Sequence, residues 1–408
     1  MSDYISRVKA VNLPEGEFFV CGSAIMDVLG IRKAADMDIL VSPRLYEKLE
    51  KEDGWKKHPK YNILQDKDKI CGAKTTLDFM KENYSLEEVL PLATYIEGVP
   101  FMSLEMLINA KEQMGREKDF ADIKLIKEYQ YFNSIKGKIL DSKGYRERLK
   151  GISNDDLYCY ELHNDERALY YFGVRHSSDV DNPMFLNLKQ TFMDFKPDMV
   201  LVEGNPRIND DSESYREELR AMSEDEAKTR GESRYTLKLS SDNNIDAYSP
   251  DPDVPEVIEY LVDLGYTQKD ICYFYLYSEL HRYARGLRDD SFISSDFEEY
   301  ITPQIEELAL YKGWTTETLN ELVHECVSNI TSENMDYCID QLSPIPEEGE
   351  TYTVINEISQ QSSYFRDLYI VKKIIKYGLQ YKRLFIVFGS GHAIKEETAL
   401  RSFFELLN

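Results

Sequence analysis

The stretch CGSAIMDVLGIRKAADMDILV, residues 21–41, joins a glycine-serine turn to two carboxylates that stand two positions apart. Gly22 and Ser23 follow an apolar, strand-like run and precede a helix-like one. Asp36 and Asp38 open the next strand-like run. Side chains at positions i and i+2 of a strand point to the same face, so both carboxylates are expected to project together from a half-buried strand.

Two carboxylates this close repel each other unless a cation lies between them. Mg²⁺ or Mn²⁺ would suit this position, because both ions take oxygen ligands. The turn at Gly22 and Ser23 offers backbone N–H groups and a hydroxyl near a helix start, which suits a phosphate. The run TTLDFM adds a third carboxylate, Asp78. These parts indicate a metal-dependent site for phosphoryl or nucleotidyl transfer, and the alternative is a solvated strand edge.

The segment VPFMSLEMLINAKEQMGREKDFADI, residues 99–123, predicts two helices joined by a short turn at GREKD. Together with the glycine-serine, DMD and LDF pieces, it resembles the minimal nucleotidyltransferase fold, in particular the branch of toxin-type nucleotidyltransferases. Four separated pieces occur in the same order, and the resemblance covers roughly residues 15–130. It implies a small α/β domain with a mixed sheet over residues 1–135.

The same resemblance implies roles for single residues. They are triphosphate binding by Gly22 and Ser23, metal binding by Asp36, Asp38 and Asp78, base catalysis by Asp78, and contacts to phosphate or acceptor by Lys111 and Lys118. An alternative for Lys118, Asp119 and Asp122 is an i,i+4 charge network on a helix surface without chemistry.

The chain has 408 residues, which predicts two or three domains. Its net charge of −25 is uneven, because residues 1–135 hold 19 basic and 23 acidic side chains and the rest holds 30 and 51. An acidic C-terminal part disfavours long nucleic acid and anionic membranes as partners, whereas a small molecule, a protein or an RNA end stays open as acceptor. Neither a long apolar run nor a signal-like start occurs, and six scattered cysteines read as reduced thiols. We expect a cytoplasmic protein.

Beyond residue 135 the pattern changes to strand-like runs that alternate with amphipathic segments. The strand-like runs are ALYYFGV, DMVLVEG, NIDAYSP, ICYFYLY and RLFIVFG. This alternation predicts a larger α/β domain at 166–408 with a mostly parallel sheet, after a linker with one helix at 136–165. A helical insert is expected at roughly 290–345, before the last strand.

Three polar side chains stand where strand-like runs end in glycine-containing turns: His176, Glu203 and His392. Ligands of open parallel sheets bind beyond the carboxyl ends of the strands, so these side chains are expected to line one pocket. Histidine and glutamate serve acid–base catalysis or metal ligation, and a divalent metal is therefore a candidate cofactor. The alternative for each histidine is a hydrogen-bonded loop residue.

Several other charged residues are candidates for the same pocket. Arg282 and Arg285 share one helix face as a candidate anion clamp. Further candidates are Glu232 and Arg234 in GESRYTLKL and Arg366 and Asp367 in YFRDLYIVKKI.

The runs FGVRHS, PDMVLVEG and FGSGHA resemble the superfamily that contains the TraB/PrgY pheromone-shutdown proteins, Tiki proteases, ChaN-like proteins and erythromycin esterases. The match spans roughly residues 167–408. The resemblance implies that His176, Glu203 and His392 are catalytic. Members are hydrolytic, metal-dependent and proteolytic, or haem-binding, so the reaction type stays open.

The two resemblances together predict a two-domain enzyme. Its first domain transfers a nucleotidyl group from an NTP, and its second is hydrolase-like. One alternative is a degenerate transferase that senses nucleotide beside a ligand-binding or hydrolytic domain. Another is a catalytic second domain for which the first domain only recruits a substrate.

Overall fold

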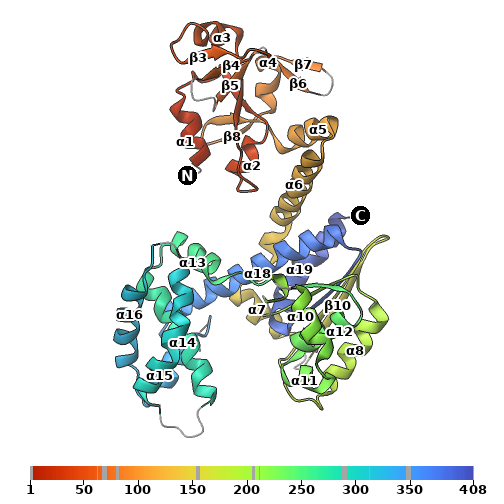
Figure 1. Cartoon of the computed structure of the whole chain (residues 1–408), viewed down its shortest axis with the longest axis vertical. Helices are drawn as coiled ribbons and strands as arrows, with labels where there is room; N and C mark the ends of the chain where they lie inside the picture. Colours follow the sequence, from red (N-terminus) through yellow and green to blue (C-terminus); the bar gives the residue numbers. More distant parts are fainter. Residues whose placement is uncertain are drawn as a thin grey trace. The chain divides into compact units, whose positions relative to one another are not determined.

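The structure is a computed structural model in which the chain divides into two compact units, residues 1–130 and 131–408 (Figure 1). The fold is α/β, with one mixed sheet of seven strands and another of five. The described residues are 3–61, 63–66, 71–79, 82–152, 157–204, 207–210, 212–286, 292–311, 313–345 and 351–407.

Unit 1 is built on the seven-stranded sheet, in the order β3-β4-β5-β2-β1-β9-β8. The β2–β5 and β1–β9 pairs are parallel and the other pairs are antiparallel, as a mixed sheet requires. The strands are β1 (Phe18–Cys21), β2 (Met37–Val41), β3 (Trp55–Lys57), β4 (Leu64–Asp66), β5 (Cys71–Lys74), β8 (Thr94–Ile96) and β9 (Val99–Phe101). A separate antiparallel hairpin consists of β6 (Leu77–Phe79) and β7 (Glu82–Tyr84).

The helices of unit 1 include the two predicted around GREKD, which are α5 and α6. Ser103 begins α5 because its hydroxyl accepts a hydrogen bond from the backbone N–H of Met106. Helix α6 crosses the boundary between the units at residue 130. The helical segments are α1 (Asp3–Ala10), α2 (Ala24–Val28), α3 (Pro43–Leu49), α4 (Leu86–Val89), η1 (Leu90–Leu92), α5 (Leu104–Met114) and α6 (Glu117–Ile135).

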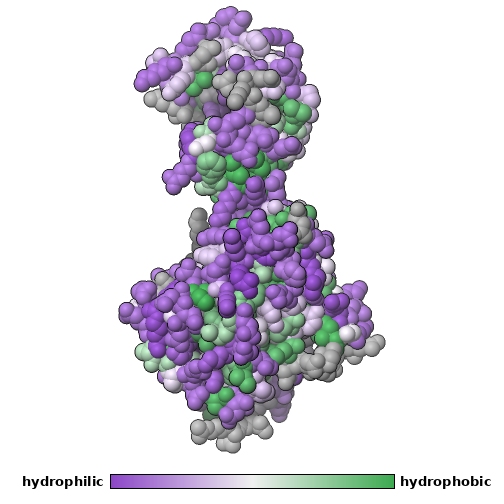
Figure 2. All heavy atoms as spheres, turned by 90° about the vertical axis from the view of Figure 1, so that its right-hand side faces the viewer, coloured by the Kyte–Doolittle hydropathy of each residue, from purple (hydrophilic) through white to green (hydrophobic). Residues whose placement is uncertain are grey.

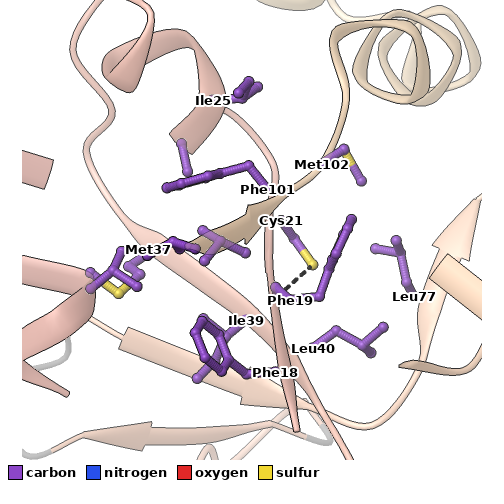
Figure 3. Packing of buried hydrophobic residues seen from close by; sticks show 14 of the residues in the cluster. Phe18, Phe19, Cys21, Ile25, Met37, Ile39, Leu40, Leu77, Phe101 and Met102 are labelled. Atoms are coloured by element: carbon purple, nitrogen blue, oxygen red, sulfur yellow. Dashed lines mark hydrogen bonds between the residues drawn. The ribbon is translucent and has the colours of Figure 1, made fainter. Parts of the chain in front are cut away.

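The core of unit 1 forms around β1 and β2 (Figure 3). All four residues of β1 are buried, and the Cys21 thiol donates to the carbonyl oxygen of Phe19. In β2, Met37 and Ile39 are buried and Asp38 between them is exposed. The predicted alternation is therefore present over residues 37–39, where Asp38 lies on the face opposite Met37 and Ile39, whereas Leu40 and Val41 are both buried.

Unit 2 contains the five-stranded sheet, in the order β10-β11-β14-β12-β13. Strand β10 is antiparallel to β11 and the other pairs are parallel, so the predicted mostly parallel sheet is confirmed. Residues 157–163, expected within a linker, form the edge strand β10. The strands are β10 (Leu157–His163), β11 (Ala168–Val174), β12 (Met199–Val202), β13 (Asp246–Tyr248) and β14 (Arg383–Gly389).

One predicted strand of unit 2 is wrong, because the run ICYFYLY lies inside helix α14 (Gln268–Gly286). A short apolar run fits a buried strand and a buried helix equally well, and the surrounding helical pattern decides here. Helices α13 to α17 make the helical region longer than the predicted insert.

The helical segments of unit 2 after α6 are η2 (Lys136–Lys138), α7 (Ser142–Leu149), α8 (Pro183–Phe195), α9 (Arg207–Asp210), α10 (Ser212–Ala221), α11 (Glu224–Thr229), α12 (Glu232–Asp242), α13 (Val254–Asp263), α14 (Gln268–Gly286), α15 (Ser294–Ile301), η3 (Thr302–Leu310), α16 (Thr316–Ser328), α17 (Met335–Asp340), α18 (Val354–Gln380) and α19 (Ser390–Leu406).

Hydrophilic side chains dominate the face of the molecule that Figure 2 shows, with hydrophobic residues between them. Among the described residues, every helix is too short or too polar to cross a membrane.

Candidate functional site

The site of unit 2 lies where three neighbouring parallel strands end. His176 follows β11, Glu203 follows β12, and His392 stands in the first turn of α19 directly after β14. Because β11, β14 and β12 are adjacent and parallel, their carboxyl ends meet at one edge of the sheet. The structure therefore brings together the three residues that the sequence singled out.

The two histidines face opposite oxygens of one carboxylate. Nε2 of His176 lies 3.8 Å from Oε2 of Glu203, and Nε2 of His392 lies 3.7 Å from Oε1. The backbone N–H of Gly389 donates to Oε2 at 2.7 Å. A Cβ on Gly389 would lie 3.3 Å from Nε2 of His176, so a glycine here keeps the space between the ring and the strand end.

Each histidine has a second carboxylate behind it. Nδ1 of His176 is hydrogen-bonded to Glu232, and Nδ1 of His392 lies 2.5 Å from Oδ1 of Asp367. Such a partner fixes the orientation of an imidazole and puts its proton on Nδ1, as in carboxylate–histidine pairs generally. The two rings differ in access, because the side chain of His176 is 63% exposed and that of His392 is 12% exposed.

Arg366 supplies the positive charge beside Glu203. Its Nη2 lies 3.0 Å from Oε1 of Glu203 and 2.6 Å from Oδ1 of Asp251. Asp251 also accepts from the backbone N–H of Gly204 at 2.7 Å. Asp251 was not predicted from the sequence, although it follows strand β13 closely, as the other residues of the site follow their strands.

These contacts shift the ionisation of the site. Burial favours a raised pKa of Glu203, but His392, Arg366, the Gly389 N–H and His176 outweigh it and lower the pKa to about 2. The hydrogen bond to Glu232 raises the pKa of His176 above its ordinary value, against the opposing effect of burial. Glu203 is therefore an anion at neutral pH, and the protonated form of His176 is favoured.

A cavity of about 600 Å³ adjoins Glu203 and Arg366. Helices α13, α14, α15 and α18 and the segment η3 form its walls. Arg282, expected as part of an anion clamp, lines the cavity and is ion-paired with Glu279. The side chain of Arg285 lies outside the described residues. Arg234 lies 3.9 Å from Glu218 and over the ring of Tyr215.

In unit 1, the structure places Asp38 against the glycine-serine turn. Cys21, the residue before Gly22, is the register partner of Asp38 in the antiparallel β1–β2 pair. A Cβ on Gly22 would lie 4.0 Å from Oδ2 of Asp38, and one on Gly72 would lie 3.2 Å from Oδ1. The adjacent Asp36 is exposed, and its carbonyl oxygen accepts from the hydroxyl of Tyr4 at 2.9 Å.

The positive charge of Lys74 does not fully compensate the cost of ionising Asp38. Although the residue as a whole is exposed, the protein packed around its carboxylate displaces part of the water and raises its pKa; Lys74 of strand β5 opposes this shift, and Asp36 adds to it. Lys74 was not predicted from the sequence; it pairs in register with Leu40 and so lies on the strand beside Asp38.

The remaining predicted residues of unit 1 lie in different environments. Ser23 accepts from Nη2 of Arg32 at 3.0 Å. The side chain of Lys111 is buried, and its Nζ lies 2.5 Å from Oδ2 of Asp122. Lys118 is exposed on α6. Asp78 belongs to β6, in the separate hairpin, and its side chain lies outside the described side chains.

A buried ion network therefore involves the segment after GREKD. Asp122 accepts from Arg32 and Lys111, and Asp119 accepts from Arg116 at 2.6 Å. Both aspartates are buried, so the alternative of a charge network on the helix surface is wrong for them. Arg32 links this network to the hydroxyl of Ser23.

Comparisons of the chain with family models, with curated proteins and with solved structures found no match. The two resemblances seen in the motifs therefore stay predictions, and the case for a function rests on the geometry of the sites.

Proposed function

We propose that unit 2 is a hydrolase that cleaves an acyl bond, in an ester or an amide, by general acid–base catalysis. The observation that carries this proposal is the pair of imidazoles, each with a carboxylate at Nδ1, whose Nε2 atoms face opposite oxygens of Glu203. Histidine gains and loses a proton near neutral pH, so two rings at one site can take a proton from water and give one to a leaving group.

In the proposed reaction, Nε2 of His392 accepts a proton from water while the water oxygen bonds to the carbonyl carbon. His176 donates the proton on its Nε2 to the leaving oxygen or nitrogen as the bond to the carbonyl carbon breaks. The products are a carboxylic acid and an alcohol or amine. Glu203, kept ionised by its neighbours, stabilises positive charge on both rings.

The charge of the site favours an acyl substrate over a phosphate ester. Four carboxylates, those of Glu203, Glu232, Asp251 and Asp367, surround the histidines, and Arg366 is paired with two of them. This surplus of negative charge opposes a dianionic group. The adjoining cavity of about 600 Å³ has the size of sites for drug-sized molecules.

The donor set fits a divalent metal poorly. The guanidinium of Arg366 and the N–H of Gly389 already donate to the two oxygens of Glu203, the central carboxylate. A cation bound there would meet the positive charge of Arg366 at close range. The proposed chemistry therefore uses the histidines alone.

The experiment is a hydrolysis assay with p-nitrophenyl and aminocoumarin esters and amides of graded size, with and without added Mg²⁺, Mn²⁺ or Zn²⁺. Replacing His392 with alanine is expected to lower kcat/KM about 100-fold or more. The matched control is His163→Ala, on the exposed face of the edge strand β10. Equal rates for both variants, or turnover that requires an added metal, would contradict the proposal.

A second candidate concerns unit 1. We propose that it transfers a nucleotidyl group from an NTP to an acceptor, because Asp38 borders the glycine-serine turn and Asp36 stands two positions before it. The raised pKa of Asp38 fits a site that lacks a cation. Asp36 and Asp38 would hold Mg²⁺ or Mn²⁺, and the metal would neutralise charge on the transferred phosphorus.

This second candidate is tested with labelled NTPs, Mg²⁺ and a cell extract as the source of acceptors. Label transfer by the wild type that is lost in Asp36→Ala, and kept in the exposed control Glu47→Ala, supports a transferase. Calorimetry separates the alternatives. NTP binding without transfer would indicate a nucleotide sensor, and the absence of both would leave unit 1 without a nucleotide role.

A further inference from the structure

A buried cluster of ionisable side chains lies behind His392. It combines residues of three elements: Tyr171 of β11, Asp367 of α18, and Lys395 and Glu396 of α19, one turn after His392. The proposed reaction uses His392 but leaves the rest of this cluster without a role.

Asp367 has a polar partner at each of its two carboxylate oxygens. Its side chain is fully buried, Oδ1 lies 2.5 Å from Nδ1 of His392, and Oδ2 lies 2.9 Å from Nζ of Lys395. Lys395 also donates to the hydroxyl of Ser363 at 2.7 Å. Because the lysine fixes one oxygen of Asp367, the other oxygen is held toward the imidazole.

Glu396, in contrast, has a hydrogen-bond partner at only one of its carboxylate oxygens among the described residues. Its side chain is fully buried, and Oε2 accepts from the hydroxyl of Tyr171 at 3.0 Å. Oε1 has no hydrogen-bond partner among the described residues, and it lies 3.9 Å from Nδ1 of His392. An ionised Glu396 would place a second negative charge beside Asp367 with one oxygen bare of donors, at a large desolvation cost.

We propose that Glu396 is an uncharged, proton-carrying positioning residue, and that it acts with the Asp367–Lys395 pair to keep the His392 proton on Nδ1. The neutral carboxyl fills the space beside the ring without competing with Asp367 for the Nδ1 proton. Nε2 of His392 is then left free to act as the base. This last step rests on the proposed hydrolase function, whereas the charge of Glu396 and the tautomer of His392 do not.

The electrostatic surroundings support a protonated Glu396. Burial and the nearby Asp367 raise its pKa well above the ordinary value, while Tyr171 and Lys395 oppose the shift and Glu203 adds to it. Tyr160 of β10 faces the same carboxyl, and its own pKa is also raised, first by burial and then by Glu396. His392 completes the groups that face Glu396.

A metal ion is the competing occupant of this cluster. Ligand atoms of Asp367, His392 and Glu396 lie within 4.8 Å of one another. A metal would need an ionised Glu396, and it would have to share Asp367 with the ammonium group of Lys395. The proposal requires a neutral Glu396 and a bound metal requires a negatively charged one, so an experiment can separate the two.

The first test compares two neighbouring glutamates in the full chain. Glu397 is also largely buried, but it accepts from Tyr158 and Arg401, and its pKa is lowered by these partners against the effect of burial. We expect Glu396→Gln to leave the urea midpoint of unit 2 unchanged between pH 6 and pH 9, and Glu397→Gln to lower it. An equal loss in both variants would overturn the proposal.

The second test determines by NMR which nitrogen of the His392 ring carries the proton. In protein labelled with ¹⁵N in the histidine rings, assigned with a His392→Gln variant, we expect His392 to show an N–H at Nδ1 and a bare Nε2 near pH 8. Glu396→Gln should keep this pattern, and Asp367→Asn should lose it. A proton on Nε2 in the wild type would contradict the proposal, as would a stoichiometric divalent metal that Glu396→Gln removes. Neither readout depends on hydrolysis, so a failure of the hydrolase assay stays distinguishable.

Discussion

Both units hold carboxylates at strand ends, after the neighbouring strands β12 and β13 in unit 2 and at the start of β2 in unit 1, but they compensate the negative charge differently. In unit 2, Glu203 is surrounded by Arg366, a backbone N–H and two histidines, and its pKa falls to about 2. In unit 1, burial raises the pKa of Asp38 despite Lys74, and Asp36 adds to the rise. Unit 2 therefore compensates the charge of its central carboxylate with its own residues, whereas the charge of Asp38 in unit 1 is compensated less, as the proposed metal site requires.

The two tryptophans allow each unit to be followed separately. Trp55 lies in β3 of unit 1, and Trp314 lies in unit 2 between η3 and α16. Chemical denaturation of a Trp314→Phe chain reports unit 1 by fluorescence, and a Trp55→Phe chain reports unit 2. The predictions below use these two backgrounds.

The largest expected contrast is between two aspartates. Asp367→Asn leaves the buried Lys395 without its anion and should lower the free energy of unfolding of unit 2 by about 3–5 kcal/mol. Asp38→Asn removes the desolvation cost of the charged carboxylate and its repulsion by Asp36, and it should change unit 1 by about 0.5 kcal/mol or less, toward higher stability. Urea denaturation at pH 7 measures both free energies of unfolding, and a large loss of stability in Asp38→Asn would contradict the expected difference between the two sites.

The pH dependence should separate the same two sites. Since the folded pKa of Glu203 lies below its ordinary value of 4.5, its contribution to stability is present above pH 4.5 and lost as the pH falls toward about 2. The penalty of Glu203→Gln should therefore shrink from roughly 3 kcal/mol at pH 6 to below about 0.5 kcal/mol at pH 2.

For Asp38 the sign is reversed. Its folded pKa is raised, so the charged form destabilises unit 1 above that pKa, and the gain from Asp38→Asn should vanish as the pH falls. Denaturation series at several pH values test both slopes. If the change in unfolding free energy had the same pH dependence in Glu203→Gln and Asp38→Asn, the two carboxylates would not differ in how their charge is compensated.

Two glycines give a smaller contrast. A Cβ on Gly173 of β11 would lie 2.4 Å from the carbonyl oxygen of Tyr158 and 2.8 Å from Cβ of Ala393. Gly173→Ala should cost unit 2 about 1–3 kcal/mol through overpacking. Gly22→Ala should cost unit 1 about 1 kcal/mol, because Gly22 has a φ of +67°. Gly137→Ala is the control, since open space surrounds that glycine among the described residues.

Metal addition should give a contrast of similar size to the glycine substitutions. If Asp36 and Asp38 take Mg²⁺, a concentration ten times the dissociation constant should stabilise unit 1 by about 1.4 kcal/mol and leave unit 2 unchanged. The denaturation midpoint of each background with and without Mg²⁺ measures this effect. Asp38→Asn should abolish the response, and a response of unit 2 alone would reverse the assignment of the metal site.

Most of the unit 2 site could be predicted from the sequence, including the supporting residues Glu232, Arg366 and Asp367 as candidates. His176, Glu203 and His392 follow strand-like runs, and such runs are visible because buried parallel strands are continuously apolar. Lys395 and Glu396 were missed, although residues three and four positions after His392 share its helix face.

By itself, the sequence determined the alternation of β2, the two helices around GREKD and the strand ends that carry the histidines. These features depend on local periodicity, which a short window of residues contains. It could not separate strand from helix in ICYFYLY, because both structures bury such a run.

Only the tertiary structure decided which charges meet. Arg32 approaches Ser23 and Asp122, Asp251 approaches Arg366, and Asp367 lies behind His392, at separations along the chain that no local pattern encodes. The ionisation of a carboxyl group depends on its burial and on the charges within a few ångströms. The chemistry of both sites therefore follows from packing between elements that are distant in the sequence.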